Sequence, residues 1–464
     1  MKIKILTLLL VLFAILLCSC DNTEGNTRKN YETINLNVFN WGQYISDETE
    51  PESGLFPVNE KFEEYFNENL ADKYQCYIKI NYITYATNEE MYDKLLNSAV
   101  SYDVIVPSDY TIQKLREAGE LLPLDFSIIT NYGNISDEFK NLAYDPQNNY
   151  SVPYSYGMVG VIYNQEFVDE TDVYDENGLG SWDLMWNSKY AGKILQYNNP
   201  RDAFATAMFK EGIDINSKDP ADWERALELL KEQKPLLQAY VNDEVFNKMK
   251  GSNAYISSYY AGDYLTMAAD NTDLRFYYPK EGTNYFVDAF CIPKTTTERK
   301  YPLANEYINF MIATEQAIAN ALYIGYASPN KTVVESDEYK ELLDYNYSIY
   351  ESDAEDAECL VDAYEILYGK TKDSYKDVYR FDLAYETYYK RENGSVDIQE
   401  HVNTLWESLK TENSTELWIH VTSAVIVVGV LGFAIYSTYI KKKRSKFYRE
   451  RDKELRKQKQ QMKK

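Results

Sequence analysis

Histidine is almost missing from this chain of 464 residues, which contains only His401 and His420. Zinc sites and Ser-His or Cys-His catalysis need histidine as a ligand or base, so the sequence argues against them. The five cysteines form no Cys-x-x-Cys pair, and their spacing is not that of a disulfide framework. Phosphate-binding glycine loops and the Gly-x-Ser-x-Gly motif are also absent. We therefore expect no enzyme activity, no catalytic residue, no metal site and no cofactor.

Acidic residues outnumber basic ones over the chain as a whole, whereas basic residues dominate the C-terminal end. The formal net charge of the whole chain is −25, while residues 441–464 hold 13 Lys and Arg against three Asp and Glu. The remainder of the chain therefore carries −35. So much negative charge argues against nucleic acid as a partner. It favours cationic ligands by long-range attraction, although plain solubility is an alternative explanation of surface acid.

The N-terminal residues 1–20 are predicted to be a signal peptide. Lys2 and Lys4 form a basic start, and Ile5–Leu17 is an apolar run too short to span a membrane comfortably. The sequence Leu17-Cys-Ser-Cys20 resembles a bacterial lipobox. This resemblance implies that Cys20 is lipidated and becomes the first residue of the mature chain. Ordinary signal-peptide cleavage nearby is the alternative.

The C-terminal part of the sequence predicts a membrane anchor. Residues 417–440 are 24 residues without Asp, Glu, Lys or Arg, and as a helix they would be about 36 Å long. Trp418, Tyr436 and Tyr439 lie near its ends, where interface aromatics are common. By the positive-inside rule, the basic tail 441–464 is cytoplasmic and the preceding domain is extracellular. The expected location is the cell membrane.

The exterior region, residues 32–410, alternates between predicted strands and helices. Ile34, Leu36 and Val38 alternate as in a strand, and Asp219-Pro220 is a typical helix start. This alternation predicts parallel sheets covered by helices. The region is too long for one compact core, so we expect two lobes. The predicted fold class is α/β, with two lobes of the hinge-bending kind and a C-terminal transmembrane helix.

Six segments place an aromatic or acidic residue at a turn, several of them directly after a predicted strand. Ligands of open α/β sheets bind at the carboxyl ends of strands, so these segments are candidates for a small-molecule site. Aromatic caps of the core and solvated loop carboxylates are the plain alternatives. The segments are Phe39–Ile45, Val106–Tyr110, Tyr197–Asp202, Tyr259–Asp263, Tyr285–Asp288 and Ile324–Asn330.

Taken in order, the six segments resemble the substrate-binding proteins of polyamine (spermidine/putrescine) ABC importers. The resemblance covers roughly residues 34–391. It implies a periplasmic-binding-protein fold, two α/β lobes joined by crossing strands with the ligand in the cleft. The implied lobes are about 32–152 with 289–335, and about 153–288 with 336–410. The implied function is an extracellular receptor that delivers a polyamine to ABC permease and ATPase subunits in the membrane.

The resemblance also implies the ligand-binding residues. Aromatic faces suit the methylene chain of a polyamine and attract its ammonium groups, and carboxylates pair with those groups. The implied polar contact is Ser108, and the implied acids are Asp202, Asp263 and Asp288. The implied aromatic wall consists of Trp41, Tyr44, Tyr110, Tyr260, Phe286 and Tyr326.

This chain departs from the family pattern at several site positions. Asn199 and Gln43 stand where some members carry acids, and Tyr260 and Phe286 stand where tryptophan is usual. Fewer acids should weaken the grip on a long polyamine, so we expect putrescine to bind at least as well as spermidine. The alternative is a cleft-type ABC receptor for another small solute, such as an amino acid or a sugar. The lack of histidine and of nucleophile motifs argues against an enzyme, and a surface adhesin would not need acids that converge on a cleft.

Overall fold

The structure of the protein is a computed structural model that describes residues 29–97, 100–352, 354, 357–369, 378–380 and 398–411. It divides into two compact units. Unit 1 consists of Met1–Tyr156 and Val287–Asn346, and unit 2 of Gly157–Phe286 and Tyr347–Lys464. The chain passes between the units in strands β5 (Ser151–Asn164) and β10 (Thr283–Pro293).

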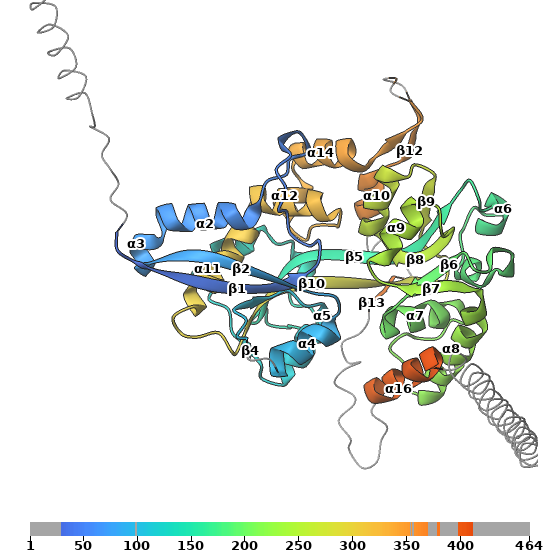
Figure 1. Ribbon diagram of the computed structural model, residues 1–464, viewed down its shortest axis with the longest axis horizontal. Helices are drawn as coiled ribbons and strands as arrows, with labels where there is room; N and C mark the ends of the chain where they lie inside the picture. The colour runs from blue at the N-terminus through green and yellow to red at the C-terminus, as the bar shows by residue number, and fades with distance from the viewer. Residues whose placement is uncertain are drawn as a thin grey trace, which may run out of the picture. The chain divides into compact units, whose positions relative to one another are not determined.

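Unit 1 is built on a sheet with the strand order β2-β1-β3-β10. β1 pairs in parallel with β2 and β3, whereas β10 is antiparallel to β3. Helix α2 lies along β2, as Figure 1 shows. Besides β5 and β10, the strands of this unit are β1 (Glu32–Trp41), β2 (Cys76–Tyr85), β3 (Val104–Ile105) and β4 (Leu121–Leu122). Its helices are α2 (Val58–Asn69), α3 (Ala71–Tyr74), α4 (Asn88–Asn97), α5 (Asp109–Glu117), α11 (Tyr301–Met311), α12 (Thr314–Ile324), α13 (Lys331–Val334) and α14 (Asp337–Tyr347).

The first strand shows why the sequence folds in this way. Ile34, Leu36 and Val38 are buried while Thr33 and Asn35 are exposed, as the alternation predicts. From Val38 to Asn40 every residue is buried, because this end of β1 lies between β2 and β3. The strand ends at Trp41, directly before a turn in which Gln43 has a left-handed backbone (φ 54°). The buried end of β1 therefore leads straight into one of the candidate site segments.

In unit 2 the strands of the sheet follow the order β5-β8-β6-β7. β6 is parallel to β7 and β8, and β5 is antiparallel to β8 and β9. The other strands are β6 (Ile194–Tyr197), β7 (Leu237–Val241), β8 (Ile256–Tyr260), β9 (Leu274–Tyr277), β11 (Ile349–Tyr350), β12 (Cys359–Val361) and β13 (Val378–Arg380). The helices are α6 (Glu170–Val173), α7 (Pro200–Lys210), α8 (Pro220–Gln233), α9 (Glu244–Lys250), α10 (Ala261–Asp270) and α16 (Ile398–Thr411).

Helix α8 forms as its sequence predicts. The Asp219 side chain accepts a hydrogen bond from the backbone N–H of Ala221, and Pro220 occupies the first turn. Trp223, at 0% exposure, packs against the ring of Phe204 on α7 with 5.6 Å between ring centroids. Helix α16 packs against α8 in turn (Figure 1). Fixing α7 matters for function, because the N-terminus of α7 carries a predicted site residue.

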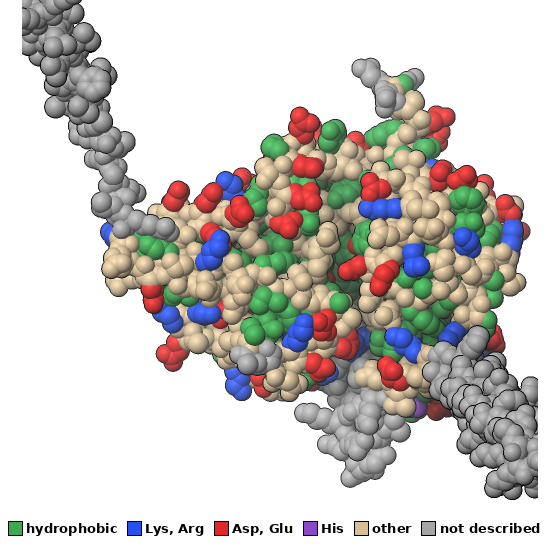
Figure 2. All heavy atoms as spheres, viewed as in Figure 1, with side chains coloured by type: hydrophobic (Ala, Val, Ile, Leu, Met, Phe, Trp, Pro, Cys, Tyr) green, Lys and Arg blue, Asp and Glu red, His purple; other side chains and the backbone are tan. Residues whose placement is uncertain are grey.

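Surface acid gathers over α14 on the face that Figure 2 shows. Four acidic side chains of this helix are exposed: Asp337, Glu338, Glu341 and Asp344. Lys340 pairs with Asp337 at 3.8 Å, and both side chains are exposed. Exposed ion pairs of this kind contribute only about 0–1 kcal/mol to folding stability. The surface acids of α14 therefore affect stability far less than a buried carboxylate does.

The predicted fold class is corrected in one part, the C-terminal transmembrane helix. Within the described residues, no helix is long and apolar enough to cross a membrane. The longest described helices, α8 and α16, have 14 residues each. A helix of that length spans only about 21 Å, less than the ~30 Å hydrocarbon core. The supported fold class is therefore the two-lobe α/β fold alone.

The segments predicted at the two ends of the chain lie outside the described residues. The predicted span 417–440 and the basic tail 441–464 lie outside the described residues. The signal peptide 1–20 and the lipidation site Cys20 lie outside them as well. Lipidation of Cys20 therefore stays a prediction from the sequence.

Candidate functional site

A buried carboxylate is the centre of the candidate site in unit 1. Asp288 lies on β10 and is only 4% exposed. The hydroxyl of Tyr44 donates a hydrogen bond of 2.7 Å to Asp288 Oδ2. Ser108 forms an isolated antiparallel bridge with Asp288. The Ser108 hydroxyl also forms a hydrogen bond that lowers the pKa of the Asp288 carboxyl group. Asp288 Oδ1 is buried and has no hydrogen-bond partner among the described residues. A ligand N–H group would remove the cost of leaving this oxygen unsatisfied.

The environment of Asp288 disfavours its charged form. Burial raises the pKa of Asp288 to about 7, from an ordinary value of 3.8. Hydrogen bonds from Ser108 and Tyr44 lower this pKa, and the negative charge of Asp109 raises it. None of these groups is a cation. An ammonium group placed beside Asp288 would therefore stabilise its ionised form strongly.

Asn88, at the start of α4, holds two of the predicted site residues in place. Its side-chain Nδ2 donates to the Ser108 hydroxyl at 3.0 Å and to the Tyr110 hydroxyl at 2.7 Å. Its Oδ1 accepts a hydrogen bond of 3.2 Å from the backbone N–H of Ser108. Asn88 is itself 4% exposed. The predicted polar contact and one predicted aromatic residue are thus oriented by a buried amide.

The aromatic residues of unit 1 are also packed together. The ring of Tyr44 meets that of Tyr326 edge-on, with 5.7 Å between centroids and an 86° interplanar angle. The Tyr154 hydroxyl donates to the Tyr44 backbone oxygen at 2.9 Å, which fixes the turn after β1. Trp41 is half-buried, packs against Tyr85 and donates from Nε1 to the Val106 oxygen at 2.9 Å. Trp41 is therefore anchored at its polar edge while part of it stays accessible.

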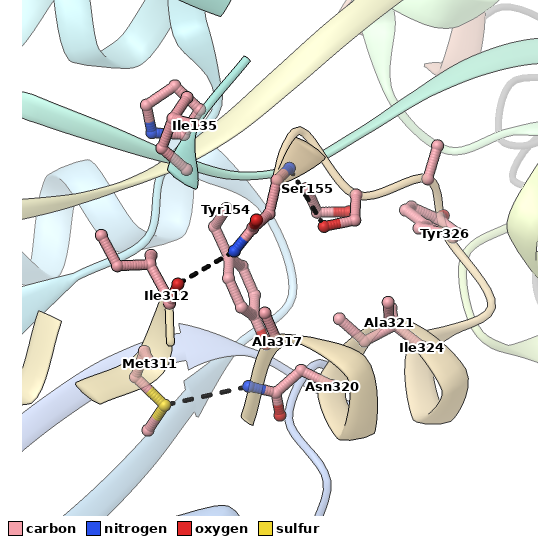
Figure 3. A pocket seen from close by; sticks show the side chains of 14 residues that line it. Ile135, Tyr154, Ser155, Met311, Ile312, Ala317, Asn320, Ala321, Ile324 and Tyr326 are labelled. Atoms are coloured by element: carbon pink, nitrogen blue, oxygen red, sulfur yellow. Dashed lines mark hydrogen bonds between the residues drawn. The ribbon is translucent and has the colours of Figure 1, made fainter. Parts of the chain in front are cut away.

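A small cavity lies behind Tyr326, and Figure 3 shows the side chains around it. Its volume is about 10 Å³, which is room for one water molecule and not for a diamine. The Ser155 hydroxyl lines it and has no hydrogen-bond partner among the described residues. The Asn320 amide on the same wall contacts the Met311 sulfur at 3.8 Å. The cavity is therefore part of the packing around Tyr326 and is not the candidate ligand-binding site.

Unit 2 contains a second buried carboxylate, Asp202, at 6% exposure. The Tyr260 hydroxyl donates to Asp202 Oδ2 at 2.7 Å, and Asn199 Nδ2 donates to the same oxygen at 2.8 Å. Asn284 Nδ2 donates to Oδ1 at 3.0 Å. Two predicted site residues, Asp202 and Tyr260, are thus in direct contact, and two asparagines orient the acid.

Both acids of unit 2 lie in the first turns of helices. Asn199 caps α7 by accepting hydrogen bonds from the backbone N–H groups of Arg201 and Asp202. Asp263 lies in the first turn of α10, which begins directly after β8. Helix N-termini carry partial positive charge and stabilise carboxylates. Both acids are therefore positioned in the same way, by a helix that begins just after the carboxyl end of a strand, β6 for Asp202 and β8 for Asp263.

Phe286 completes the aromatic part of unit 2. Its ring meets the ring of Tyr260 with 5.3 Å between centroids and a 74° interplanar angle. Gly157 on β5 gives the Phe286 ring its space, because a Cβ atom at position 157 would lie 2.8 Å from Phe286 Cζ. Glycine therefore makes room for the ring by close approach rather than by its backbone conformation.

The structure sorts the ten predicted ligand-binding residues into two clusters. In unit 1 it brings together Trp41, Tyr44, Ser108, Tyr110, Asp288 and Tyr326. In unit 2 it brings together Asp202, Tyr260 and Phe286, and it places Asp263 in the first turn of α10, where its charge acts on Tyr197 as that of Asp202 does. Asn88, Asn284 and Tyr154 support these clusters and were not predicted. The only sequence signal near Asn88 is the helix start at Thr87, and nothing in the sequence singles out Asn284.

The family of the chain follows from comparison with known proteins. Residues 60–345, more than half of the chain, match the family model described as bacterial extracellular solute-binding protein. The spermidine/putrescine-binding periplasmic protein of Salmonella typhimurium is 32% identical over 254 residues, which cover 54% of this chain and 71% of that protein. The chain therefore belongs to the bacterial extracellular solute-binding proteins and, among these, to the substrate-binding proteins of spermidine/putrescine ABC transporters.

Two solved structures have the same fold. A Listeria monocytogenes protein assigned to a spermidine/putrescine ABC transporter has a TM-score of 0.64 and 28% identity, covering 81% of this chain and 99% of that one. The spermidine/putrescine ABC transporter substrate-binding protein of Streptococcus pneumoniae has a TM-score of 0.55 and 29% identity, covering 81% and 98%. The predicted family and the two-lobe fold are confirmed. The family consists of binding receptors, so the chain is not an enzyme.

Proposed function

We propose that this protein is the extracellular receptor of an ABC importer for a small polyamine such as putrescine or spermidine. It captures the cationic ligand and delivers it to permease and ATPase subunits in the membrane. The observation that carries the proposal is Asp288, a buried carboxylate with one oxygen lacking a partner among the described residues. Membership of the spermidine/putrescine-binding family supports it independently.

The chemistry around Asp288 suits an ammonium group. Its neighbours donate neutral hydroxyl hydrogen bonds, so its negative charge is not cancelled by them. A charge-assisted hydrogen bond from an ammonium group to Oδ1 would satisfy that oxygen and compensate the charge. The rings of Tyr44 and Tyr326 offer faces for the adjoining methylene groups, and aromatic faces also attract cations.

The cluster in unit 2 supports a second amine contact. Asp202 accepts hydrogen bonds from Asn199, Tyr260 and Asn284, which fix the orientation of its carboxylate. Asp263 adds a second carboxylate at the N-terminus of α10. Tyr260 and Phe286 supply aromatic surface beside Asp202. We propose that these four residues bind an ammonium group of the ligand.

The ligand preference is proposed from the number of acids. Asn199 contacts Asp202 directly, and it is a neutral amide where the family resemblance implies an acid in some members. Three proposed acids remain, and only one of them lies on α7. We therefore propose that putrescine binds at least as well as spermidine.

Titration calorimetry with purified protein freed of carried-over ligand tests the proposal. Putrescine, spermidine, one neutral amino acid and one sugar would be compared at pH 8. A 1:1 heat with putrescine or spermidine supports a polyamine receptor. Heat only with the amino acid or sugar would instead show a receptor for another solute. A wild-type preference for spermidine of tenfold or more would contradict the proposed ligand preference alone.

A further inference from the structure

Tyr197 is the last residue of β6 and lies two residues before the Asn199 cap of α7. Its side chain is 2% exposed. Its ring stacks on Tyr259, with 5.3 Å between centroids and a 16° interplanar angle. It also meets the Tyr260 ring, again at 5.3 Å. Tyr197 is thus packed against the residue that donates to Asp202, at the strand end where this fold class holds ligands.

The hydroxyl of Tyr197 is the unusual part of this arrangement. It is buried and has no hydrogen-bond partner in the part of the chain that the structure describes. Burial raises the pKa of Tyr197 well above its ordinary value of 10.0, and the negative charges of Asp202 and Asp263 raise it further. The phenol is therefore within electrostatic reach of both proposed acids of unit 2. An unsatisfied hydroxyl in such a place costs free energy until something binds it.

We propose that Tyr197 is a further ligand-binding residue, whose hydroxyl oxygen accepts a hydrogen bond from an amine group of the ligand held by Asp202 and Asp263. The inference rests on the proposed function. An ammonium group has several N–H donors, and two carboxylates need not satisfy all of them. A neutral hydroxyl completes the set of acceptors without adding another buried charge.

Tyr240 offers a matched comparison in the same unit. It lies on β7, the strand next to β6, and its hydroxyl is likewise buried without a partner among the described residues. Its ring packs against Trp406 at 5.2 Å, and burial alone raises its pKa to about 12. Tyr240 thus shares the unsatisfied hydroxyl of Tyr197, but no acid among the described residues raises its pKa. If an unsatisfied phenol is only a feature of the core, both residues should behave alike.

The test compares Tyr197→Phe with Tyr240→Phe, because each substitution removes one oxygen and keeps the ring. Putrescine and spermidine affinities are measured by calorimetry, and thermal unfolding is followed without ligand. Tyr197→Phe should weaken the binding of at least one of the two amines about tenfold or more, as expected for a hydrogen bond to a charged group. Tyr240→Phe should leave both affinities within about twofold of wild type. Neither variant should melt below wild type, since each loses an unsatisfied buried hydroxyl.

Unchanged affinity of Tyr197→Phe, with wild type binding normally, would overturn the inference and leave the proposed function intact. Equal weakening by both variants would overturn it too, because the effect would then belong to core packing. If Tyr197→Phe melts earlier than wild type, a crystal structure of the wild-type putrescine or spermidine complex decides. A ligand nitrogen within about 3.2 Å of the Tyr197 oxygen supports the inference, and a larger separation overturns it. Failure of wild type to bind either amine would instead refute the proposed function, and this inference with it.

Discussion

The hydroxyl of Tyr44 donates a hydrogen bond of 2.7 Å to Asp288 Oδ2, although the two residues are 244 positions apart in the sequence. Both side chains are buried, at 7% and 4% exposure. The contact leaves Oδ1 as the carboxylate oxygen without a partner among the described residues. The hydrogen bond joins the turn after β1 to the middle of β10. Asp288 is therefore the first residue to substitute when the proposed ligand site is tested.

Asp288→Asn should weaken putrescine binding at pH 8 more than any change of an exposed Asp. Removing one partner of a buried charge pair costs roughly 2–5 kcal/mol, or about 30-fold or more in affinity. Calorimetry gives the affinity, with Asp344→Asn on the exposed face of α14 as the control. Wild-type affinity in Asp288→Asn would remove Asp288 from the ligand site. Without ligand, the variant should be at least as stable as wild type, because a poorly compensated buried charge has been removed.

Binding should depend on pH through Asp288, whose pKa is about 7 in the ligand-free protein. The ligand ammonium favours the ionised carboxylate, so binding below pH 7 must first release the Asp288 proton. Affinity should therefore rise about tenfold from pH 6 to pH 8 and then level off. Calorimetry in two buffers of different ionisation enthalpy would count the released proton at pH 6. The Asp288→Asn variant should show neither the pH dependence nor the proton release.

The same pKa predicts the pH dependence of stability without ligand. The folded pKa of Asp288 is raised from 3.8, so the folded state binds more protons than the unfolded state between about pH 4 and pH 7. The contribution of Asp288 to stability is therefore fully present below pH 4. It is lost as the pH rises towards 7, and it changes little above that. Denaturant unfolding of wild type and Asp288→Asn across this range isolates the contribution, and parallel curves would contradict the prediction.

Gly157→Ala should weaken ligand binding by displacing Phe286. The added Cβ would lie 2.8 Å from Phe286 Cζ, so the ring or the strand must move. Overpacking of this kind typically costs about 1–3 kcal/mol of stability. Thermal unfolding and putrescine affinity would be measured together. Gly133→Ala is the matched control, because a Cβ there has no neighbour within 4 Å. Equal behaviour of the two variants would show that Phe286 is not held by this contact.

Asn199→Asp should improve spermidine binding relative to putrescine binding. Asn199 Nδ2 lies 2.8 Å from Asp202 Oδ2, so the substitution places a second carboxylate beside the first. Repulsion between the two acids would be relieved by an additional ammonium group, worth roughly 1–3 kcal/mol if it pairs well. The ratio of the two affinities by calorimetry is the measurement. Asn199→Ser keeps a helix cap without adding charge and should leave the ratio unchanged. An unchanged ratio in Asn199→Asp as well would mean that this position does not face the ligand.

Local patterns were sufficient to predict much of the fold. The alternation of Ile34, Leu36 and Val38 predicted β1, and the Asp219-Pro220 start predicted α8. These features depend on neighbours in the chain, and such dependence can be seen in a sequence. The transmembrane prediction also rested on a local pattern, the apolar run 417–440, but the described helices contain no membrane-spanning segment. The predicted site residues came from the order of six segments and from the resemblance that this order supports.

The sequence by itself determined the family, the strand ends and the residue types of the candidate site. Only the tertiary structure decided which of these residues touch. Asn88 reaches Ser108 and Tyr110 from twenty or more positions away, and Asn284 reaches Asp202 across 82. Burial is also a property of the assembled sheet, so no local pattern could give the raised pKa of Asp288 or its unsatisfied oxygen. Hydrogen bonds and desolvation act over a few ångströms in space, whatever the separation along the chain.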